Sequence, residues 1–557
     1  MKKKQPSTRH VETLSLAALR RLVGGLLEKA EEADTRLAKL EAENRTLREE
    51  NEQLRLENTR LKIDNELLRD EIARLKNLPP KPPFKSSGMD KATDGKTGGG
   101  KGGKKKPRGP KRDTERVSRE EVLGADVPAG SRFKGYETVL VRELILASEV
   151  VCYKRERWVM PDGKTLIAPL PEGVIGGFGP AVRRFCLVMH AQGQVTTERL
   201  TSILNGIGIE ISKTQVVRLL TNGLDGFAAE DAAVLHAGLI SAPYLSVDDT
   251  GARHARKNCY TTQIGGERFC VFRATRTKSR LNFLSLLTGN YQDYVLNDAA
   301  LNYLEEHGAD LSLIARLRRG EPQRFANQVP FLEYLAQQGI DILADNTVVR
   351  ALSEAGLWGA IRHHGLLANT VIISDDAGQF RVGNHGLCWV HAERLLQKLM
   401  PATPRQASQL DAMRDLVWCF YKALKAFKQK PSPGLGKAIR YRFDRIFRVR
   451  TDYQELDKLL ARLHRRKDEL LKVLDHPEIP LHTNASENDL RTVVTKRKIS
   501  GGTMSRDGRI ARDTMLGLMK TCRKLGLSFW HYLGDRLGLN APGNSIPPLA
   551  DLIAASS

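Results

Sequence analysis

The sequence predicts a multidomain α/β protein in which a coiled coil precedes a core built of strands and long helical insertions. The chain has 557 residues, 41% hydrophobic and 27% charged, enough for about three or four domains and a sizeable buried core. Leucine recurs at every seventh residue from 40 to 75, and strand-like apolar runs between residues 244 and 376 are separated by long helical patterns. These observations exclude a fibrous or uniformly disordered protein.

The charge of the chain favours a polyanionic partner. Lysine and arginine number 88 against 65 aspartates and glutamates, a net charge of +23, and nucleic acid is the first candidate for such an excess. The seven cysteines are scattered and form no C-x-x-C pair, so neither a disulfide framework nor a zinc ribbon is indicated. No run approaches about 18 consecutive apolar residues, so we expect a cytoplasmic protein with no membrane partner.

Residues 37–78 carry a leucine-zipper heptad, after an N-terminal helical segment over residues 1–36. Four consecutive a positions are asparagine, which favours a parallel, in-register pair because each asparagine then meets its own copy. The g positions are acidic and the e positions basic, a pattern that is complementary only between parallel chains. We therefore predict a parallel homodimer, the alternative being a single solvated charged helix. The a and d residues are Leu37, Leu40, Asn44, Leu47, Asn51, Leu54, Asn58, Leu61, Asn65, Leu68, Ile72 and Leu75.

A basic flexible linker is predicted over residues 79–114. Residues 78–112 hold eleven basic side chains against Asp90 and Asp94, and they are rich in glycine and proline. Such a segment cannot bury a core. It is compatible with a solvated spacer and with a salt-sensitive contact to DNA phosphates.

Two smaller regions follow the linker. Short β-like runs at residues 137–142 and 149–154, with a turn at Pro161-Asp-Gly, indicate a small β module over residues 115–179. Residues 180–235 resemble a helix-turn-helix: one helix near 197–204, a glycine turn and a second helix from 211, for which Ser212 is a plausible N-cap. An ordinary helical hairpin would look the same. In the DNA-reading interpretation, the groove-facing residues are Lys213, Gln215 and Arg218.

Candidate catalytic residues lie at the ends of predicted strands and at the start of a late helix. The strand 244–251 contains Asp248 and Asp249, and two further strands joined by a Gly-Gly turn follow it between residues 258 and 272. The apolar strand 369–374 ends in Asp375 and Asp376, and a helix opening near Asn484 carries Glu487. This order predicts a ribonuclease-H-like core over residues 236–510, interrupted by helical insertions at 284–366 and 392–478 and followed by a C-terminal helical region, 511–557.

Acids at neighbouring strand ends can share divalent cations, and two Mg²⁺ about 4 Å apart stabilise both oxygens in phosphoryl transfer. Each acid alone is weak evidence, because aspartate often just terminates a strand. Glu487 also lies three residues after Asn484, where a capping box would place it without any catalytic role.

Taken together, these motifs resemble the DDE transposases of the insertion sequence 66 family. The resemblance rests on four runs in the family's order: Ser246–Gly251, Ser374-Asp375, His385–Arg394, and Asn484–Arg491 with Lys496-Arg-Lys. It implies Asp248, Asp375 and Glu487 as the catalytic and metal-binding triad, with Mg²⁺ or Mn²⁺ as cofactor. Asp249 stands where the family usually has glutamate. Many members carry a cysteine-rich zinc segment, whereas residues 115–180 contain only Cys152, so zinc is not implied there.

Two further groups of residues remain open to two interpretations. The H-x-x-C-x-x-H run of His385, Cys388 and His391 could bind zinc, but we favour packing beside the active site and support of it. Basic residues on and after the Glu487 helix are either a solvated helix face or DNA contacts, and their proximity to the acids favours DNA. These residues are Arg491, Lys496, Arg497, Lys498, Arg506, Arg509 and Arg512.

The sequence thus predicts a dimeric DNA transposase that cleaves a phosphodiester at an element end and joins the 3′-hydroxyl to target DNA. Its expected partners are the element ends, the target DNA and a second copy of the chain, and a need for helper proteins stays open. The alternative is a dimeric DNA-binding regulator with an inactive nuclease-like core. Metal-dependent strand cleavage distinguishes the two.

Overall fold

A computed structural model describes residues 119–126, 128, 130–318, 322–342, 347–541 and 543–555. It also describes residues 23–25, 27, 28, 31, 32, 34–36, 38, 39, 41–43, 46 and 50, all of which are helical. The chain divides into two units, residues 1–86 and residues 87–557, and each is described by itself. Most of the predicted zipper and all of the predicted linker lie outside the described residues.

The centre of the second unit is a five-stranded mixed sheet in the order β5-β4-β3-β8-β9. Strands β3 (Tyr244–His254), β4 (Lys257–Gly265) and β5 (Cys270–Thr275) are antiparallel neighbours. Strand β8 (Val371–Ser374) runs parallel to β3, and β9 (His385–Leu387) runs parallel to β8. The predicted α/β class is confirmed, and the four predicted core strands all form.

The hairpin between β4 and β5 requires glycine for a close backbone approach. A Cβ atom at Gly265 would lie 2.8 Å from the Phe269 carbonyl oxygen, and at Gly266 the backbone N–H donates to that same carbonyl at 3.1 Å. The Gly-Gly pair therefore marks the point at which the two strands turn, as the sequence indicates.

Helices occupy both inserted stretches and the flanks of the sheet. Before β3 lie α4 (Pro180–Ala191), α5 (Thr197–Gly206), α6 (Lys213–Thr221) and α7 (Asp225–Ser241). Between β5 and β8 lie α8 (Arg280–Leu287), β6 (Tyr294–Leu296), α9 (Asp298–Glu306), α10 (Leu311–Arg318), β7 (Gln323–Phe325), α11 (Gln328–Gln337) and α12 (Thr347–His363). The small antiparallel sheet of β6 and β7 is an addition to the predicted helical pattern.

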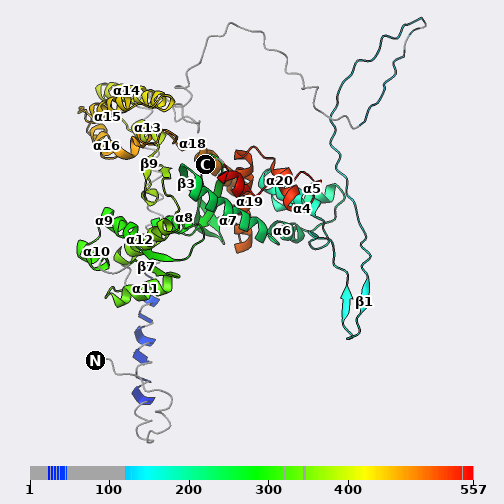
Figure 1. The fold of residues 1–557 in the computed structure, drawn as a ribbon, viewed down its shortest axis with the longest axis horizontal. Helices are drawn as coiled ribbons and strands as arrows, with labels where there is room; N and C mark the ends of the chain where they lie inside the picture. The colour runs from blue at the N-terminus through cyan, green and yellow to red at the C-terminus, as the bar shows by residue number, and fades with distance from the viewer. Residues whose placement is uncertain are drawn as a thin grey trace. The chain divides into compact units, whose positions relative to one another are not determined.

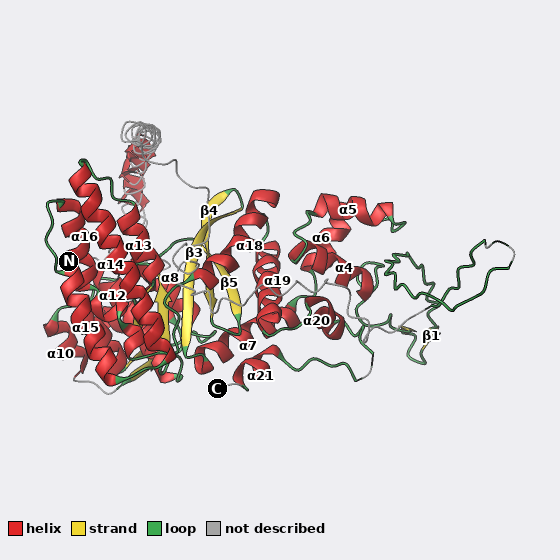
Figure 2. Cartoon of the chain, turned by 90° about the horizontal axis from the view of Figure 1, so that it is seen from above, coloured by secondary structure: helices red, strands yellow, loops and turns green. Residues whose placement is uncertain are grey.

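The second insertion is helical as expected. A 3₁₀ turn, η1 (Gly378–Phe380), precedes β9, after which come α13 (Trp389–Gln397), α14 (Pro404–Gln429), α15 (Pro433–Phe447), α16 (Gln454–Arg465), α17 (Lys467–Leu470) and η2 (Lys472–Leu474). The chain ends in α18 (Asn484–Ser500), α19 (Arg506–Lys524), α20 (Phe529–Arg536) and α21 (Leu549–Ala554). Figures 1 and 2 place α13–α16 on one side of the β3–β5 strands and α4–α6 on the other.

Two hydrophobic cores meet at the sheet. One joins α4–α12 and α18–α21 and includes Leu245, Val247 and Ile372. The other fills the α13–α16 bundle and includes Val371 and Ile373. Because neighbouring residues of a strand point to opposite faces, β8 contributes to both cores.

The strands expected at residues 137–142 and 149–154 do not form, which corrects the predicted extent of the β module. Val139 and Val150 are 72% and 95% exposed, and within the described residues neither run pairs with another strand. An isolated alternating run leaves its backbone groups and apolar side chains in water, which gives a strand no stability. In the described part of this stretch, the strands are β1 (Arg157–Val159) and β2 (Thr165–Ile167), which flank the predicted Pro161-Asp-Gly turn.

Among the described helices, none combines the length and the apolar character that crossing a membrane requires.

Candidate active site and nucleic-acid interface

The sheet register brings Asp248 and Asp375 to the same level on neighbouring parallel strands. Ser246 on β3 pairs with Ile373 on β8, and each aspartate lies two residues beyond its member of that pair. Residues two apart along a strand share a face, so the two carboxylates are directed to the same side of the sheet. Consistent with this proximity, the charge of Asp375 contributes to a raised pKa of Asp248.

The adjacent aspartates have cationic partners. Asp249 forms an ion pair with Lys278 and accepts a hydrogen bond from Gln379 Nε2 at 2.8 Å. Asp376 forms ion pairs with Arg462 and, at 2.9 Å, with Arg466. Their neighbours Asp248 and Asp375 thus differ from them in charge environment.

Within the described residues, neither Asp248 nor Asp375 has an ion-pair partner. Asp248 Oδ1 accepts the backbone N–H of Asp249 at 2.7 Å, and Asp375 Oδ1 accepts that of Ala377 at 3.0 Å. Burial, followed by the charges of Asp375 and Asp249, raises the pKa of Asp248 to about 7, although the hydrogen bond and His391 act in the opposite direction. The two carboxyls thus have no ion-pair contact of their own among the described residues, and the charges of His391 and Lys278 act on them from farther away.

The third acid, Glu487, lies in the first turn of α18, a helix that packs against β3 and β4. Ser486 is fully buried and its hydroxyl bonds to that of Ser246 on β3, which fixes this end of the helix against the sheet. The Glu487 carboxylate accepts two hydrogen bonds from Arg394, at 2.7 and 3.3 Å. The N-cap of α18 is Thr483, with no side-chain cap, so the capping-box interpretation of Glu487 is wrong.

The H-x-x-C-x-x-H residues each contact a different part of the site. His385 Nε2 lies 2.8 Å from the Ser374 hydroxyl, and the Cys388 sulfur accepts the Thr483 backbone N–H at 3.3 Å. His391 Nε2 lies 3.6 Å from Glu487 Oε1. These contacts join β8, β9 and α13 to the start of α18.

Cys388 and His391 also change each other's ionisation. Burial alone would raise the pKa of Cys388, but its contact with His391 lowers that pKa below the usual value. The same contact raises the pKa of His391 against the effect of burial. An imidazolium beside Glu487 and near Asp248 is thereby favoured.

The acids carry the donor atoms that a hard divalent cation prefers. Carboxylate oxygens are the ligands preferred by Mg²⁺ and Mn²⁺, and Asp248 and Asp375 fit such a cation because both lack a protein counter-charge. Over the described ranges, however, no three histidine, cysteine, aspartate or glutamate side chains are already grouped as metal ligands. Glu487 is instead engaged by Arg394.

The predicted helix-turn-helix corresponds to α5 and α6. Ser212 is the N-cap of α6 as predicted, and Gln215 completes a capping box with it: Ser212 Oγ accepts the Gln215 N–H at 3.3 Å and Gln215 Oε1 accepts the Ser212 N–H at 2.8 Å. Lys213 forms an ion pair with Glu198 at 2.6 Å. Arg218 is exposed. Gln215 therefore has a structural role that the DNA-reading interpretation did not include.

The basic residues of α18 and α19 separate into two groups. Lys498 and Arg506 are exposed and Arg509 is half-buried, as is Arg497, whose guanidinium bonds to the Gly251 carbonyl. Arg491 is exposed and donates to Asn488 Oδ1 at 2.9 Å.

Lys496 and Arg512 are directed into the protein. Lys496 is only 5% exposed and its ammonium donates to the His190 carbonyl at 2.6 Å, which corrects its assignment as a surface phosphate contact. Arg512 donates to Asp513 at 2.7 Å. Lys496 is buried because it lies on the face of α18 that contacts α4. Three consecutive basic residues in the sequence do not indicate which of them has that position.

Sequence reasoning did not assign Arg394, Lys278 or Arg466 a role. Arg394 lies three residues after His391, so one helix face presents both to Glu487, and this spacing was a detectable signal. Lys278 and Arg466 contact Asp249 and Asp376 from distant segments, and no local pattern indicates them.

Comparison with known proteins adds two findings. The model of the transposase IS66 family matches residues 372–511, a range that contains Asp375, the H-x-x-C-x-x-H run and Glu487. An uncharacterized protein of Sinorhizobium fredii (strain NBRC 101917 / NGR234), y4jO, is 73% identical over 324 residues, which cover 58% of this chain and 100% of that relative.

Proposed function

This chain belongs to the transposase IS66 family, and from that premise we propose that it is a metal-dependent DDE transposase. It would cleave a phosphodiester at the ends of an insertion element and join the freed 3′-hydroxyl to target DNA. The proposed core is ribonuclease-H-like, which is supported by a sheet of three antiparallel strands followed by two parallel ones.

One observation carries the proposal: among the described residues, the partly buried carboxyls of Asp248 and Asp375 on neighbouring strands have no ion-pair partner, whereas Asp249 and Asp376 each have one. Burial first, and then the charge of Asp375, raise the pKa of Asp248, so keeping that carboxyl ionised at neutral pH lowers the free energy of unfolding. Functional sites commonly retain such an unfavourable arrangement because a ligand completes it. The ligand that suits two hard oxygen donors is a divalent cation.

We propose Asp248, Asp375 and Glu487 as the residues that hold Mg²⁺ or Mn²⁺. When bound, the cations supply Lewis-acid stabilisation of the attacking and leaving oxygens of the phosphodiester. Glu487 would be available to hold a cation once its ion pair with Arg394 is broken. His391 and Arg394, which lie next to Glu487, would supply positive charge near the phosphate of the DNA. The hydrogen bond between Ser246 and Ser486 holds the start of α18 against β3.

DNA would contact the exposed cations of the helices around this site. The proposed contacts are Arg218 on α6, Arg491, Arg497 and Lys498 on α18, and Arg506 and Arg509 on α19. A second copy of the chain would join through the zipper of residues 37–78, so that two active sites act on two element ends.

The test is a cleavage assay on a nested set of duplexes that cover the DNA on both sides of the chain's own gene. We expect new 3′-hydroxyl ends with Mg²⁺ or Mn²⁺, none with EDTA, and none with Asp248→Asn. Asp376→Asn is the matched control, since that aspartate ends the β8 run but is paired with arginines. If the whole set is bound but never cut with either metal, the proposal is wrong.

The alternative function, a dimeric DNA-binding regulator with an inactive core, is favoured by one observation. The Glu487 carboxylate is held by Arg394 through two hydrogen bonds, and that ion pair by itself would keep the third acid from a cation. DNA binding without cleavage in the same assay would support this function.

A further inference from the structure

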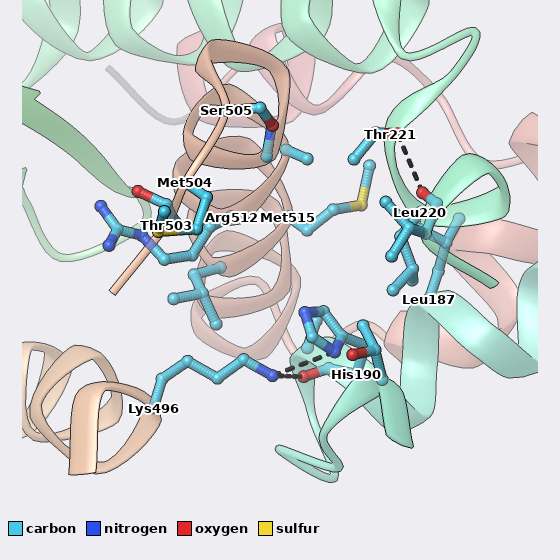
Figure 3. A pocket seen from close by; sticks show the side chains of 16 residues that line it. Leu187, His190, Leu220, Thr221, Lys496, Thr503, Met504, Ser505, Arg512 and Met515 are labelled. Carbon is cyan, nitrogen blue, oxygen red and sulfur yellow. Dashed lines mark hydrogen bonds between the residues drawn. The ribbon is translucent and has the colours of Figure 1, made fainter. Parts of the chain in front are cut away.

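A cavity lies beyond the acid site, where the helix-turn-helix segment meets α18 and α19 (Figure 3). Its volume is about 300 Å³. Side chains from α4, α6 and α19 form the apolar walls, among them Leu187, Leu220 and Met515, and the loop between α18 and α19 contributes Met504 at the rim. Met504 is 63% exposed, and Val217, which lines the cavity from α6, is 39% exposed, so solvent reaches both side chains.

Among the described residues, no acidic side chain lines this cavity, and its polar side chains include hydrogen-bond donors. Of its sixteen lining residues none is an aspartate or glutamate, while Lys496, Arg512 and His190 are present. Burial and the nearby Lys496 charge lower the pKa of His190 to about 4, so that imidazole is neutral at pH 7. A ligand with apolar faces and carbonyl acceptors matches this lining, whereas a cationic ligand does not.

Lys496 supplies a donor that the protein does not fully use. Its ammonium carries three N–H groups, and among the described residues the atoms within hydrogen-bond distance are the His190 carbonyl at 2.6 Å and His190 Nδ1 at 3.2 Å. That nitrogen also lies 2.9 Å from the Val195 carbonyl. At least one N–H of Lys496 is thus available to an acceptor in the cavity.

The cavity is held at a fixed distance from the acids. Lys496 follows Glu487 by nine residues on α18, a rise of about 13.5 Å at 1.5 Å per residue. One strand of B-DNA advances about 3.4 Å per nucleotide, so the cavity is about four nucleotides from the proposed cleavage site. The loop at its mouth is rigid, because Thr503 exchanges backbone hydrogen bonds with the β3–β4 turn at 2.8 and 3.1 Å.

The rim places cations where a DNA backbone would pass. Arg218 follows the lining residue Val217 on α6, while Lys498 and Arg506 lie on either side of the loop that carries Met504, and all three are exposed. Cations at the rim match the phosphates of a DNA strand, and the apolar interior with its hydrogen-bond donor matches a base. Together they match a nucleotide whose base has left the stack.

We propose that this cavity binds a single extruded nucleobase of the DNA, and that it prefers a base with carbonyl acceptors and an apolar edge, of which thymine is the best match. The inference rests on the proposed function in so far as DNA is the substrate. Methionine and leucine side chains cover the base faces, Lys496 donates to a carbonyl oxygen, and the apolar wall accepts the C5-methyl group.

The test measures DNA binding in EDTA, so that it does not depend on cleavage. The probes are one 30-base-pair duplex in three forms: fully paired, with a single bulged thymine, and with a single bulged abasic site. The full chain should bind the thymine bulge about tenfold more tightly than the abasic bulge, since a stacked base contributes roughly 1–3 kcal/mol. A 4-thiothymine at the bulge should photo-crosslink to Met504 or Lys496, identified by mass spectrometry.

Val217→Trp fills the cavity from an exposed rim position and should remove the thymine preference while leaving affinity for paired duplex unchanged. The matched control is Ile203→Trp, on the same helix-turn-helix segment and 37% exposed, which does not line the cavity and should behave as wild type. Equal affinity for both bulges, or crosslinks only to residues outside the cavity, would overturn the inference while leaving the transposase proposal intact. Failure to bind any of the three duplexes would overturn both.

Discussion

Replacing Asp248 with asparagine should stabilise the protein at alkaline pH in the absence of metal. Folding moves the pKa of this carboxyl from 3.8 to about 7. Between these values the folded protein holds a proton that the unfolded chain releases, so the free energy of unfolding falls as the pH rises through that window. Above about pH 7 the whole penalty is present, and asparagine, which does not ionise, avoids it.

The size of the effect follows from the shift. About three pKa units correspond to roughly 4 kcal/mol, at about 1.4 kcal/mol per unit, and this is the upper limit. Asparagine can still accept the Asp249 N–H through its Oδ1, but its buried NH₂ group lacks a partner, which costs about 1–2 kcal/mol. We therefore expect Asp248→Asn to gain about 2–3 kcal/mol at pH 8, and to lose stability slightly at pH 4.

The measurement is urea unfolding of the wild type and Asp248→Asn in EDTA at pH 4, 6 and 8, followed by tryptophan fluorescence. The control is Asp376→Asn, which loses ion pairs with Arg462 and Arg466 and should be unchanged or less stable at pH 8. Repeating the pH 8 series with Mg²⁺ should stabilise the wild type and not Asp248→Asn, because only the former binds the cation. If Asp248→Asn is no more stable at pH 8, or if its advantage does not shrink on acidification, the carboxyl pair does not lack a counter-charge.

Three further predictions concern other parts of the site. Asp375→Asn and Glu487→Gln should each abolish cleavage on denaturing gels while gel-shift affinity for DNA is retained; an active Glu487→Gln protein would exclude Glu487 from the triad. Arg394→Met should tighten Mn²⁺ binding about tenfold in calorimetry, because it frees Glu487 from a charge-assisted pair, and an unchanged affinity would mean that this pair persists beside the metal. Gln215→Ala should lower the free energy of unfolding by about 1 kcal/mol through loss of the capping box, and should weaken binding to all duplexes alike; a loss on one sequence alone would make Gln215 a base-reading residue.

The sequence was sufficient for those parts of the fold that local patterns determine. Strand β3 was found because its apolar residues alternate, and α6 because Ser212 has the chemistry of an N-cap. The three residues of β9 are too few to show any period, so that strand could not be predicted. Residues 137–142 show the opposite error, since alternation describes what a strand needs but not whether a partner strand is available.

For the site, the acids could be predicted and their partners could not. Both acids belong to strand patterns that the sequence shows locally: Asp375 directly follows β8, whereas Asp248 lies inside β3, which continues past the predicted end of that strand. The contact between Arg394 and Glu487 joins residues 93 apart, and the ion pair of Lys278 with Asp249 depends on how α8 meets the sheet. Lys496 shows the same limit, because three adjacent basic residues on a helix point in different directions and only the tertiary fold decides which is buried.

The four residues of β8 link the packing of the two hydrophobic cores to the position of a proposed catalytic acid. Ile372 packs into one hydrophobic core, Val371 and Ile373 pack into the other, and Asp375 follows directly. If the packing of the α13–α16 bundle loosens, β8 loses the contacts of Val371 and Ile373, and the position of Asp375, a proposed metal ligand, becomes less well defined. Excising that bundle to obtain a minimal nuclease should leave the acid misplaced, and heat-sensitive variants with wild-type behaviour at low temperature should be found among bundle residues far from any DNA.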